Sequence, residues 1–215
     1  MTKKIGVVDY DIGNVKSVVS ALNKLSAEVV FSDNASELND CNGIVIPGVG
    51  AFNHGMDKLQ KKDLIAPISE FASSGKPVLG ICLGMQLLFE SSNEYGLTDG
   101  LALIGGVVKN LNDFNNADDE LRLPHVGWCS LSEYENGHAW SDSIYKNSNV
   151  SDYFYFVHSY AVEPENEKYI LSMTKYNGVN FVSSVKKSNI IGMQFHPEKS
   201  GEAGLSLLKK FIELC

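Results

Sequence analysis

The chain has 215 residues, which is enough for one sizeable hydrophobic core, and we expect a single domain spanning residues 1–215. Its net charge of −8 argues against nucleic acid as the main partner, because phosphate contacts need clustered lysine and arginine. No apolar run approaches the length that crosses a bilayer, and Met1 is followed almost directly by a strand pattern. We therefore expect a cytoplasmic protein that does not enter a membrane.

The cysteines and histidines are scattered along the sequence. Among the cysteines no Cys-x-x-Cys pair occurs, which argues against a disulfide framework and against a cysteine zinc site. The histidines give no set of three at metal-ligand spacing, so we expect neither a metal nor another cofactor. These residues are Cys41, Cys82, Cys129 and Cys215, and His54, His125, His138, His158 and His196.

The first half of the chain alternates short apolar strands with helices. A helix capped by Asn14 is predicted from Val15 onward, because valine and leucine recur there at three- and four-residue spacing. Strands without polar alternation are typical of a parallel sheet that is covered on both faces. The predicted strands are Lys4–Asp9, Glu28–Phe31 and Gly43–Pro47, and two further helices are predicted over Asn53–Gln60 and Asp63–Ala72.

The second half has short β-type runs separated by turns. The turn residues Asn177-Gly178 and Ser188-Asn189 indicate antiparallel pairing, and an amphipathic helix is predicted over Glu202–Leu214. The predicted strands are Gly105–Leu111, Tyr153–Val157, Tyr169–Met173, Phe181–Val185 and Ile190–Phe195. The predicted fold class is α/β: a mostly parallel open sheet flanked by helices on both faces, with antiparallel strands added from the second half.

One stretch carries a pattern for covalent chemistry. A buried strand, Pro77–Ile81, leads into Cys82, which Gly80 and Gly84 flank before a helix that continues to Phe89. Gly-x-Cys-x-Gly between a strand and a helix is the cysteine form of the nucleophile elbow, and the helix N-terminus favours a thiolate there. The alternative is that Cys82 is a small buried hydrophobic residue, as free cysteine often is.

A second stretch supplies a base and a carboxylate. His196 follows an apolar strand, and Pro197 separates it from Glu198. An imidazole can take the proton of a thiol while a carboxylate orients the ring, so the pair suits a cysteine nucleophile. A turn histidine beside a solvated glutamate, or half of a metal site, are the alternatives.

A third stretch supplies backbone N–H groups. Glycines in Pro47-Gly-Val-Gly50 follow a strand, and the N–H groups of Val49 or Gly50, together with that of Leu83, can face an oxyanion. A tight turn explains these glycines equally well, whereas a phosphate loop lacks its Gly-Lys-Ser/Thr ending. The three stretches together predict acyl transfer through a cysteine thioester.

These stretches also resemble a known family. Pro47-Gly-Val-Gly50, Gly80-Ile-Cys-Leu-Gly-Met-Gln86 and Phe195-His-Pro-Glu198 resemble the triad (class I) glutamine amidotransferases, whose fold is flavodoxin-like. Leu123-Pro-His-Val-Gly-Trp128 and Tyr155-Phe-Val-His-Ser-Tyr160 are similar to one subfamily, the glutaminase subunits of imidazole glycerol phosphate synthase. The resemblance runs from Ile5 to the C-terminal helix.

The resemblance implies a role for each residue of the site. Cys82 is expected to be the nucleophile, His196 the general base and acid, and Glu198 the orienting carboxylate. The glutamine substrate is expected to bind where the family binds it, although a solvent-facing helix residue or a loop charge would explain Gln86 and Glu94 as well. The residues expected to bind it are Gln86, Glu94, His158, Ser159 and Tyr160.

The resemblance also implies a partner. Ammonia is expected to pass to a separate (β/α)₈-barrel cyclase subunit, in a heterodimer that forms imidazole glycerol phosphate and aminoimidazole carboxamide ribotide. The residues matching the family's interface are Asn14, Trp128, Tyr155 and Lys199. An exposed Trp suits an interface, while core packing of Trp128 and solvation of Lys199 are the alternatives.

One position departs from the family, which usually has asparagine after Gly-Trp where this chain has Cys129. The departure raises the possibility of a paralogous subunit that supplies ammonia to amidate a surface-polysaccharide sugar. Two other hypotheses are a stand-alone γ-glutamyl hydrolase and a binding module without catalysis. The intact set of Cys82, His196 and Glu198 argues against the last of these.

Overall fold

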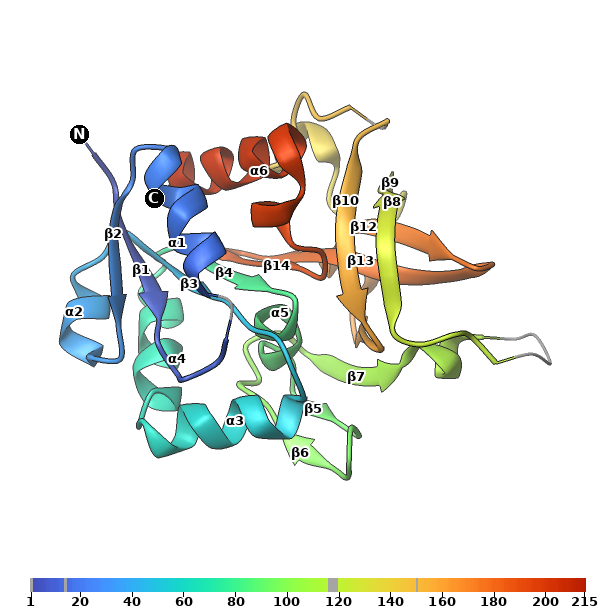
Figure 1. The fold of residues 1–215 in the computed structure, drawn as a ribbon, viewed down its shortest axis with the longest axis horizontal. Helices are drawn as coiled ribbons and strands as arrows, with labels where there is room; N and C mark the ends of the chain where they lie inside the picture. Colours follow the sequence, from blue (N-terminus) through green and yellow to red (C-terminus); the bar gives the residue numbers. More distant parts are fainter. Residues whose placement is uncertain (1, 14, 116–119, 150) are drawn as a thin grey trace.

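A central eight-stranded sheet organises the computed structural model, which describes residues 2–13, 15–115, 120–149 and 151–215 (Figure 1). The strand order is β2-β1-β3-β4-β14-β13-β12-β9. Pairing is parallel from β2 to β14 and antiparallel from β14 to β9, as the sequence predicts. The strands are β1 (Lys4–Val8), β2 (Glu28–Ser32), β3 (Gly43–Ile46), β4 (Val78–Ile81), β9 (Ser132–Glu133), β12 (Ile170–Tyr176), β13 (Val179–Lys187) and β14 (Ile190–Met193).

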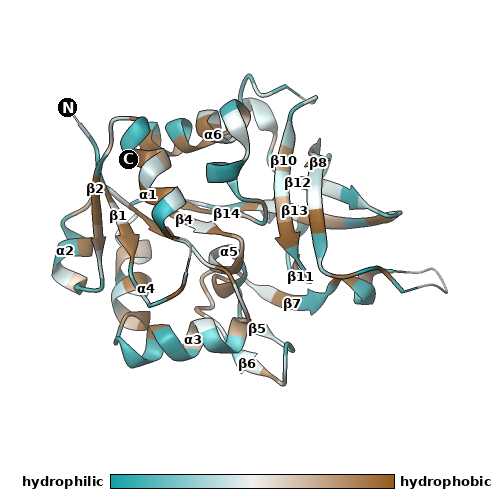
Figure 2. Ribbon diagram, in the orientation of Figure 1, coloured by the Kyte–Doolittle hydropathy of each residue, from teal (hydrophilic) through white to brown (hydrophobic). Residues whose placement is uncertain are grey.

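Helices cover both faces of this sheet (Figure 1). One face packs against α1 (Val15–Lys24) and α6 (Gly201–Leu214), and the other against α2 (Ala35–Asn39), α3 (Phe52–Lys61), α4 (Ile65–Ser73) and α5 (Leu83–Leu87). Figure 2 shows strand β1 in brown and much of α3 in teal, since α3 turns a polar side to solvent. The α/β fold class is confirmed.

Burial explains why the central strands read as unbroken apolar runs. Every residue of β3, β4 and β14 is buried, because helices lie above and below these strands. Their carboxyl ends meet at one edge of the sheet, where ligand sites of open α/β sheets form. The chain leaves this edge at three places: after β3 toward Pro47, after β4 at Cys82 and after β14 toward His196.

Two smaller sheets come from the part of the chain that follows α5. One pairs β8 (His125–Ser130) with β10 (Tyr153–His158), and the other contains β5 (Ser91–Ser92), β6 (Thr98–Asp99), β7 (Gly106–Asn110) and β11 (Tyr160–Pro164). Turns at Asn177-Gly178 and Ser188-Asn189 join antiparallel neighbours, as predicted. Short 3₁₀ helices are η1 (Leu111–Phe114), η2 (Trp140–Asp142), η3 (Glu167–Tyr169) and η4 (Pro197–Lys199).

Several elements escape prediction because their patterns are short. Helix α2 has only five residues, so no helical period develops; the side chain of Asn34 caps it by accepting from the N–H groups of Ser36 and Glu37. Strand β8 contains a glycine and a cysteine that weaken its alternation.

Within the described residues, no helix is both long and apolar enough to cross a membrane.

Candidate active site

Cys82 lies in a strained turn between β4 and α5. Its backbone has φ +53° and ψ −109°, a region that L-residues rarely adopt. The flanking glycines are required by close backbone contacts: a Cβ on Gly84 would lie 1.8 Å from the Ile46 carbonyl oxygen, and one on Gly80 would lie 2.6 Å from the Gly84 oxygen. The elbow that the sequence predicts is therefore formed, although α5 ends at Leu87 rather than Phe89.

His196 and Glu198 are held together beside this turn. Nδ1 of His196 lies 2.8 Å from Oε1 of Glu198, and both side chains are almost fully buried. The backbone N–H of His196 donates to the Tyr155 carbonyl over 2.9 Å, which anchors the histidine to β10. Burial alone would lower the pKa of His196, but interactions with Cys82 and Glu198 outweigh it and raise that pKa to about 9.

Two buried polar atoms of this pair lack a hydrogen-bond partner among the described residues: Nε2 of His196 and Oε2 of Glu198. Buried nitrogen atoms are normally paired, so an unpaired one calls for an explanation, of which a catalytic role is one. Because Nδ1 is occupied by Glu198, Nε2 is the ring nitrogen left for proton exchange, and Cys82 is near enough to help raise the pKa of His196.

A cavity of about 440 Å³ opens at Cys82. It brings together every residue predicted for the oxyanion site and for the substrate, with Cys82 among them. Its lining is Val49, Gly50, Ala51, Cys82, Leu83, Gln86, Glu94, Tyr95, Pro124, Val157, His158, Ser159 and Tyr160. Leu83 is the first residue of α5, so its N–H has no partner within the helix.

Gln86 is not the solvent-facing helix residue of its alternative interpretation, whereas Glu94 is a partly buried turn carboxylate that makes a specific hydrogen bond. Gln86 is buried, and its Nε2 donates to the Tyr160 carbonyl over 2.9 Å. Oε2 of Glu94 accepts from the N–H of Phe52 over 2.8 Å and so meets the N-terminus of α3. Burial raises the pKa of Glu94, and the bond from Phe52 opposes that rise.

Sequence reasoning did not single out Tyr10, which supports the Pro47–Gly50 turn. The Tyr10 hydroxyl is buried and donates to the Pro47 carbonyl. Burial raises the pKa of Tyr10, with a further contribution from Cys82. A Cβ on Gly48 would lie 2.6 Å from the Tyr10 oxygen, so the glycine allows the close approach of ring and turn. The sequence signal that could have identified Tyr10 is its position directly after the predicted strand Lys4–Asp9.

A buried chain of polar side chains, also unforeseen, runs from the cavity into β8. Nδ1 of His158 lies 2.8 Å from the Tyr160 carbonyl oxygen, which can only accept, so this nitrogen carries the proton. Nε2 of His158 then accepts from Nδ1 of His125 over 3.1 Å, and the Cys129 thiol donates to Nε2 of His125 over 3.5 Å. Cys129 thus lies on the inner side of β8, outside the cavity lining.

Three of the four predicted partner residues lie close to one another, and the centroid of the Tyr155 ring lies 6.4 Å from that of the His196 ring. Trp128 is 53% exposed, and its ring meets that of Tyr155 at a centroid distance of 5.8 Å across the β8–β10 pair. Nζ of Lys199 lies 5.7 Å from the centre of the Tyr155 ring. Trp128, Tyr155 and Lys199 therefore form one cluster, which we call the aromatic patch. Asn14, the fourth predicted residue, lies outside the described residues.

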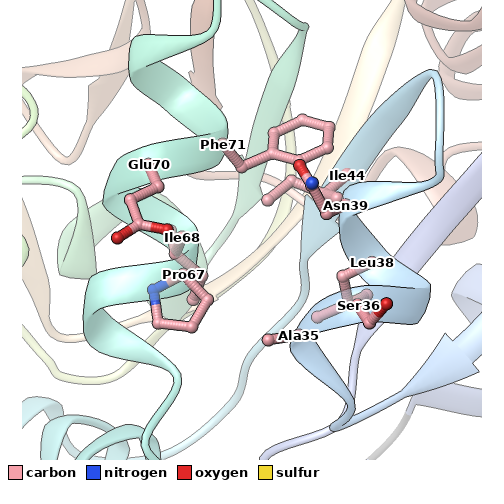
Figure 3. Close-up of a pocket in the computed structure, with 9 residues that line it drawn as sticks. All are labelled: Ala35, Ser36, Leu38, Asn39, Ile44, Pro67, Ile68, Glu70 and Phe71. Atoms are coloured by element: carbon pink, nitrogen blue, oxygen red, sulfur yellow. The ribbon is translucent and has the colours of Figure 1, made fainter.

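A separate cavity, of about 210 Å³, lies between α2 and α4 and shares no lining residue with the cavity at Cys82. Figure 3 shows it lined by Pro67, Ile68 and Phe71 on one side and by α2 on the other. It offers no cysteine or histidine, and so no nucleophile–base pair.

Among the described residues, no group of three or more histidine, cysteine, aspartate or glutamate side chains is arranged to hold a metal ion.

Comparison with known proteins identifies relatives of the whole chain. The family model described as glutamine amidotransferase class-I matches residues 6–214. The chain is 41% identical over 211 residues to the imidazole glycerol phosphate synthase subunit HisH 1 of Legionella pneumophila (strain Lens), covering 98% of this chain and 99% of that one. It is 42% identical over 210 residues to the subunit HisH of Oceanobacillus iheyensis, covering 98% of each.

Solved structures share the fold at lower identity. A protein from Thermoplasma acidophilum described as a putative GMP synthase subunit superposes with a TM-score of 0.72 at 20% identity, covering 100% of this chain and 94% of the other. PurLQS from Thermotoga maritima gives a TM-score of 0.72 at 18% identity, with 99% of each chain covered. The family match and the near full-length relatives therefore show that the chain belongs to the class I glutamine amidotransferases, and within them to the family of the imidazole glycerol phosphate synthase subunits HisH.

Proposed function

We propose that this chain, as a single amidotransferase domain, hydrolyses glutamine to glutamate and ammonia through Cys82, His196 and Glu198. The observation that carries the proposal is the strained Cys82 in the lining of the cavity, together with the buried His196–Glu198 pair that interacts with it. Strained backbone persists at functional sites because the surrounding structure over-determines it. The cytoplasm is the proposed location.

The first step forms a covalent intermediate. The Cys82 sulfur attacks the side-chain amide carbon of glutamine, and the amide oxygen becomes an oxyanion. The N–H groups of Leu83 and of Val49 or Gly50, which line the cavity, are the proposed donors to that oxygen. Nε2 of His196 takes the thiol proton, and Glu198 stabilises the resulting imidazolium, in keeping with the raised pKa of His196.

The second step releases both products. The protonated His196 gives its proton to the leaving nitrogen, the C–N bond breaks and ammonia departs, leaving a thioester on Cys82. His196 then removes a proton from water, which attacks the thioester and liberates glutamate and the thiol. Gln86, Glu94 and the His158–Tyr160 segment are proposed to hold the substrate, because all of them face the cavity.

The ammonia is proposed to pass to a (β/α)₈-barrel cyclase subunit, which uses it to form imidazole glycerol phosphate and aminoimidazole carboxamide ribotide in histidine biosynthesis. Support comes from the names of the relatives, each a subunit of imidazole glycerol phosphate synthase. Further support comes from the aromatic patch, since an exposed tryptophan beside a second aromatic ring suits a protein interface. The proposed assembly is a heterodimer.

Cys129 does not favour the polysaccharide paralogue. Its thiol donates to His125 on the inner side of β8, and an asparagine side chain also has a donor for that nitrogen. The substitution therefore changes a supporting contact outside the cavity lining. The stand-alone hydrolase is disfavoured by near full-length similarity to relatives that are named as subunits.

The experiment is to measure ammonia release from glutamine by the wild type and by Cys82→Ser, each alone and with the cyclase subunit in the presence of its nucleotide ligand. We expect low activity alone, acceleration by the liganded partner and no activity in Cys82→Ser. Full activity in Cys82→Ser would refute the triad assignment. High activity that the partner leaves unchanged would instead support the stand-alone hydrolase.

A further inference from the structure

A second buried amide, Gln194, lies beside the cysteine. Gln194 follows β14 and is completely withdrawn from solvent, and its Nε2 lies 3.7 Å from Sγ of Cys82. Its backbone N–H donates to the Ser183 carbonyl over 2.9 Å, which anchors the residue to β13. Burying an amide is costly unless its groups are hydrogen-bonded, so the partners of Gln194 show what the residue is placed to do.

The orientation of this amide follows from a fixed acceptor. The Tyr160 carbonyl oxygen can only accept, so the atom of Gln86 that lies 2.9 Å from it must be Nε2. The same Nε2 lies 3.0 Å from the Gln194 side chain, which must therefore present its oxygen to Gln86. The nitrogen of Gln194 is left to face the sulfur of Cys82. The Tyr160 carbonyl thus fixes the orientation of the Gln86 amide and, through it, that of the Gln194 amide.

The hydrogen bond from Nε2 of Gln194 to the Cys82 sulfur affects the protonation of Cys82, because Gln194 is the donor. A donor beside sulfur binds the thiolate more strongly than the thiol, because it stabilises the charged form. On another side, the Val157 carbonyl oxygen lies 3.7 Å from the same sulfur and accepts only from the protonated thiol. Gln194 therefore favours ionisation and Val157 opposes it, so the two contacts compete beside the titratable side chains of His196 and Tyr10, which also interact with Cys82.

We infer that Gln194 is a further residue of the catalytic machinery, which stabilises the Cys82 thiolate through Nε2 and is oriented for this by Gln86 and the Tyr160 carbonyl. The inference rests on the proposed role of Cys82 as the nucleophile. It also limits what Gln86 offers to a ligand, since both hydrogens of its amide nitrogen are already donated to protein oxygens. Gln86 can then contact substrate only as an acceptor.

The test measures the pH dependence of Cys82 alkylation by iodoacetamide, followed at the level of the Cys82 peptide by mass spectrometry. Gln194→Met keeps the side-chain length but has no N–H, and we expect the half-maximal pH to rise by roughly one unit. Gln194→Glu should raise it at least as far in the alkaline range where the new carboxyl group is ionised, because a carboxylate repels the thiolate. Glutamine hydrolysis by Gln194→Met should fall about tenfold at neutral pH and recover at higher pH.

Ser183→Ala is the matched control. It removes the fully buried side-chain hydroxyl of Ser183 but keeps the backbone carbonyl that anchors Gln194, and it does not touch Cys82. Its alkylation profile should match that of the wild type. If folded Gln194→Met and Gln194→Glu proteins keep the wild-type profile, the inference is wrong. The alkylation result does not depend on turnover, so absence of glutamine hydrolysis in the wild type would count against the proposed function alone.

A measurement on the wild type covers the case in which the variants do not fold. The chain has three glutamines, Gln60, Gln86 and Gln194, so side-chain amide signals can be assigned after ¹⁵N-glutamine labelling. We expect the Gln194 amide signal to move when Cys82 is alkylated or titrated, while exposed Gln60 stays unchanged. If the Gln194 amide signal does not move on alkylation or on titration of Cys82, the inference is wrong.

Discussion

Nδ1 of His196 lies 2.8 Å from Oε1 of Glu198, and the two side chains are almost fully withdrawn from solvent. Because the carboxylate is an acceptor, it requires the proton to be on Nδ1. This leaves Nε2 as the ring nitrogen that can exchange a proton with the reacting groups. A buried carboxylate with one unpaired oxygen is costly, which indicates that Glu198 serves the histidine rather than the stability of the fold.

Replacing Glu198 by glutamine should keep the shape of the site and lose its charge. The amide can present a donor to Nδ1, which favours the wrong tautomer, so we expect kcat for glutamine hydrolysis to fall by roughly 10²- to 10⁴-fold. The pKa of His196, followed by NMR, should drop from its raised value of about 9. Glu202→Gln, on the exposed first turn of α6, serves as the control. A loss smaller than twofold in Glu198→Gln would contradict the orienting role.

The strain at Cys82 should appear in stability measurements. Glycine adopts positive φ without cost, whereas alanine does not, so Cys82→Gly should be more stable to urea than Cys82→Ala by about 1 kcal/mol. Cys41 is the matched control, because it is also buried but lacks a positive φ. There the order should reverse, since glycine increases the freedom of the unfolded chain. Equal stability of the two Cys82 variants would show that the turn is unstrained.

The buried histidine pair should make the protein sensitive to acid. Burial lowers the pKa of His125 to about 4, and that of His158 to about 3, from an ordinary value of 6.5. Below pH 6.5 the unfolded chain therefore binds protons that the folded chain excludes, so stability present above pH 6.5 is lost as the pH falls toward 4 and then 3. Each histidine contributes a slope of at most about 1.4 kcal/mol per pH unit in this window.

Urea unfolding between pH 7.5 and pH 5 checks this expectation. His125→Gln removes one of the two groups, so the dependence of unfolding free energy on pH should become shallower even if the variant is less stable throughout. Exposed His54, on α3, is the control, and His54→Gln should keep the wild-type slope. An unchanged slope in His125→Gln would mean that His125 does not exclude its proton on folding.

The aromatic patch should carry affinity for the proposed cyclase partner. Trp128→Ala removes an exposed ring that packs on Tyr155, and we expect Kd for the partner, measured by calorimetry, to rise roughly tenfold or more. Phe31→Ala offers a matched exposed aromatic, 48% accessible on β2, an edge strand of the central sheet, and should leave Kd unchanged. Equal losses in both variants would place the interface elsewhere.

Much of the fold could be predicted because its determinants are local or repeat with a short period. The unbroken apolar strands, the helical spacing after Val15 and the turn at Asn177-Gly178 each act over a few residues, so the parallel centre and the antiparallel extension could be inferred. Helix α2 and strand β8 were missed because five residues are too few for a helical period and because Gly127 weakens the alternation.

The sequence by itself determined the chemistry at the elbow: a cysteine between glycines that tolerate a sharp turn, and a histidine two residues from a carboxylate. Which polar groups surround that cysteine was decided only by the tertiary structure. Gln194 reaches Cys82 across 112 positions, and the Tyr160 carbonyl that orients it through Gln86 lies 74 positions from Gln86. Contacts at such separations leave no local pattern, because they arise where parallel strands end at a common edge and place distant residues together.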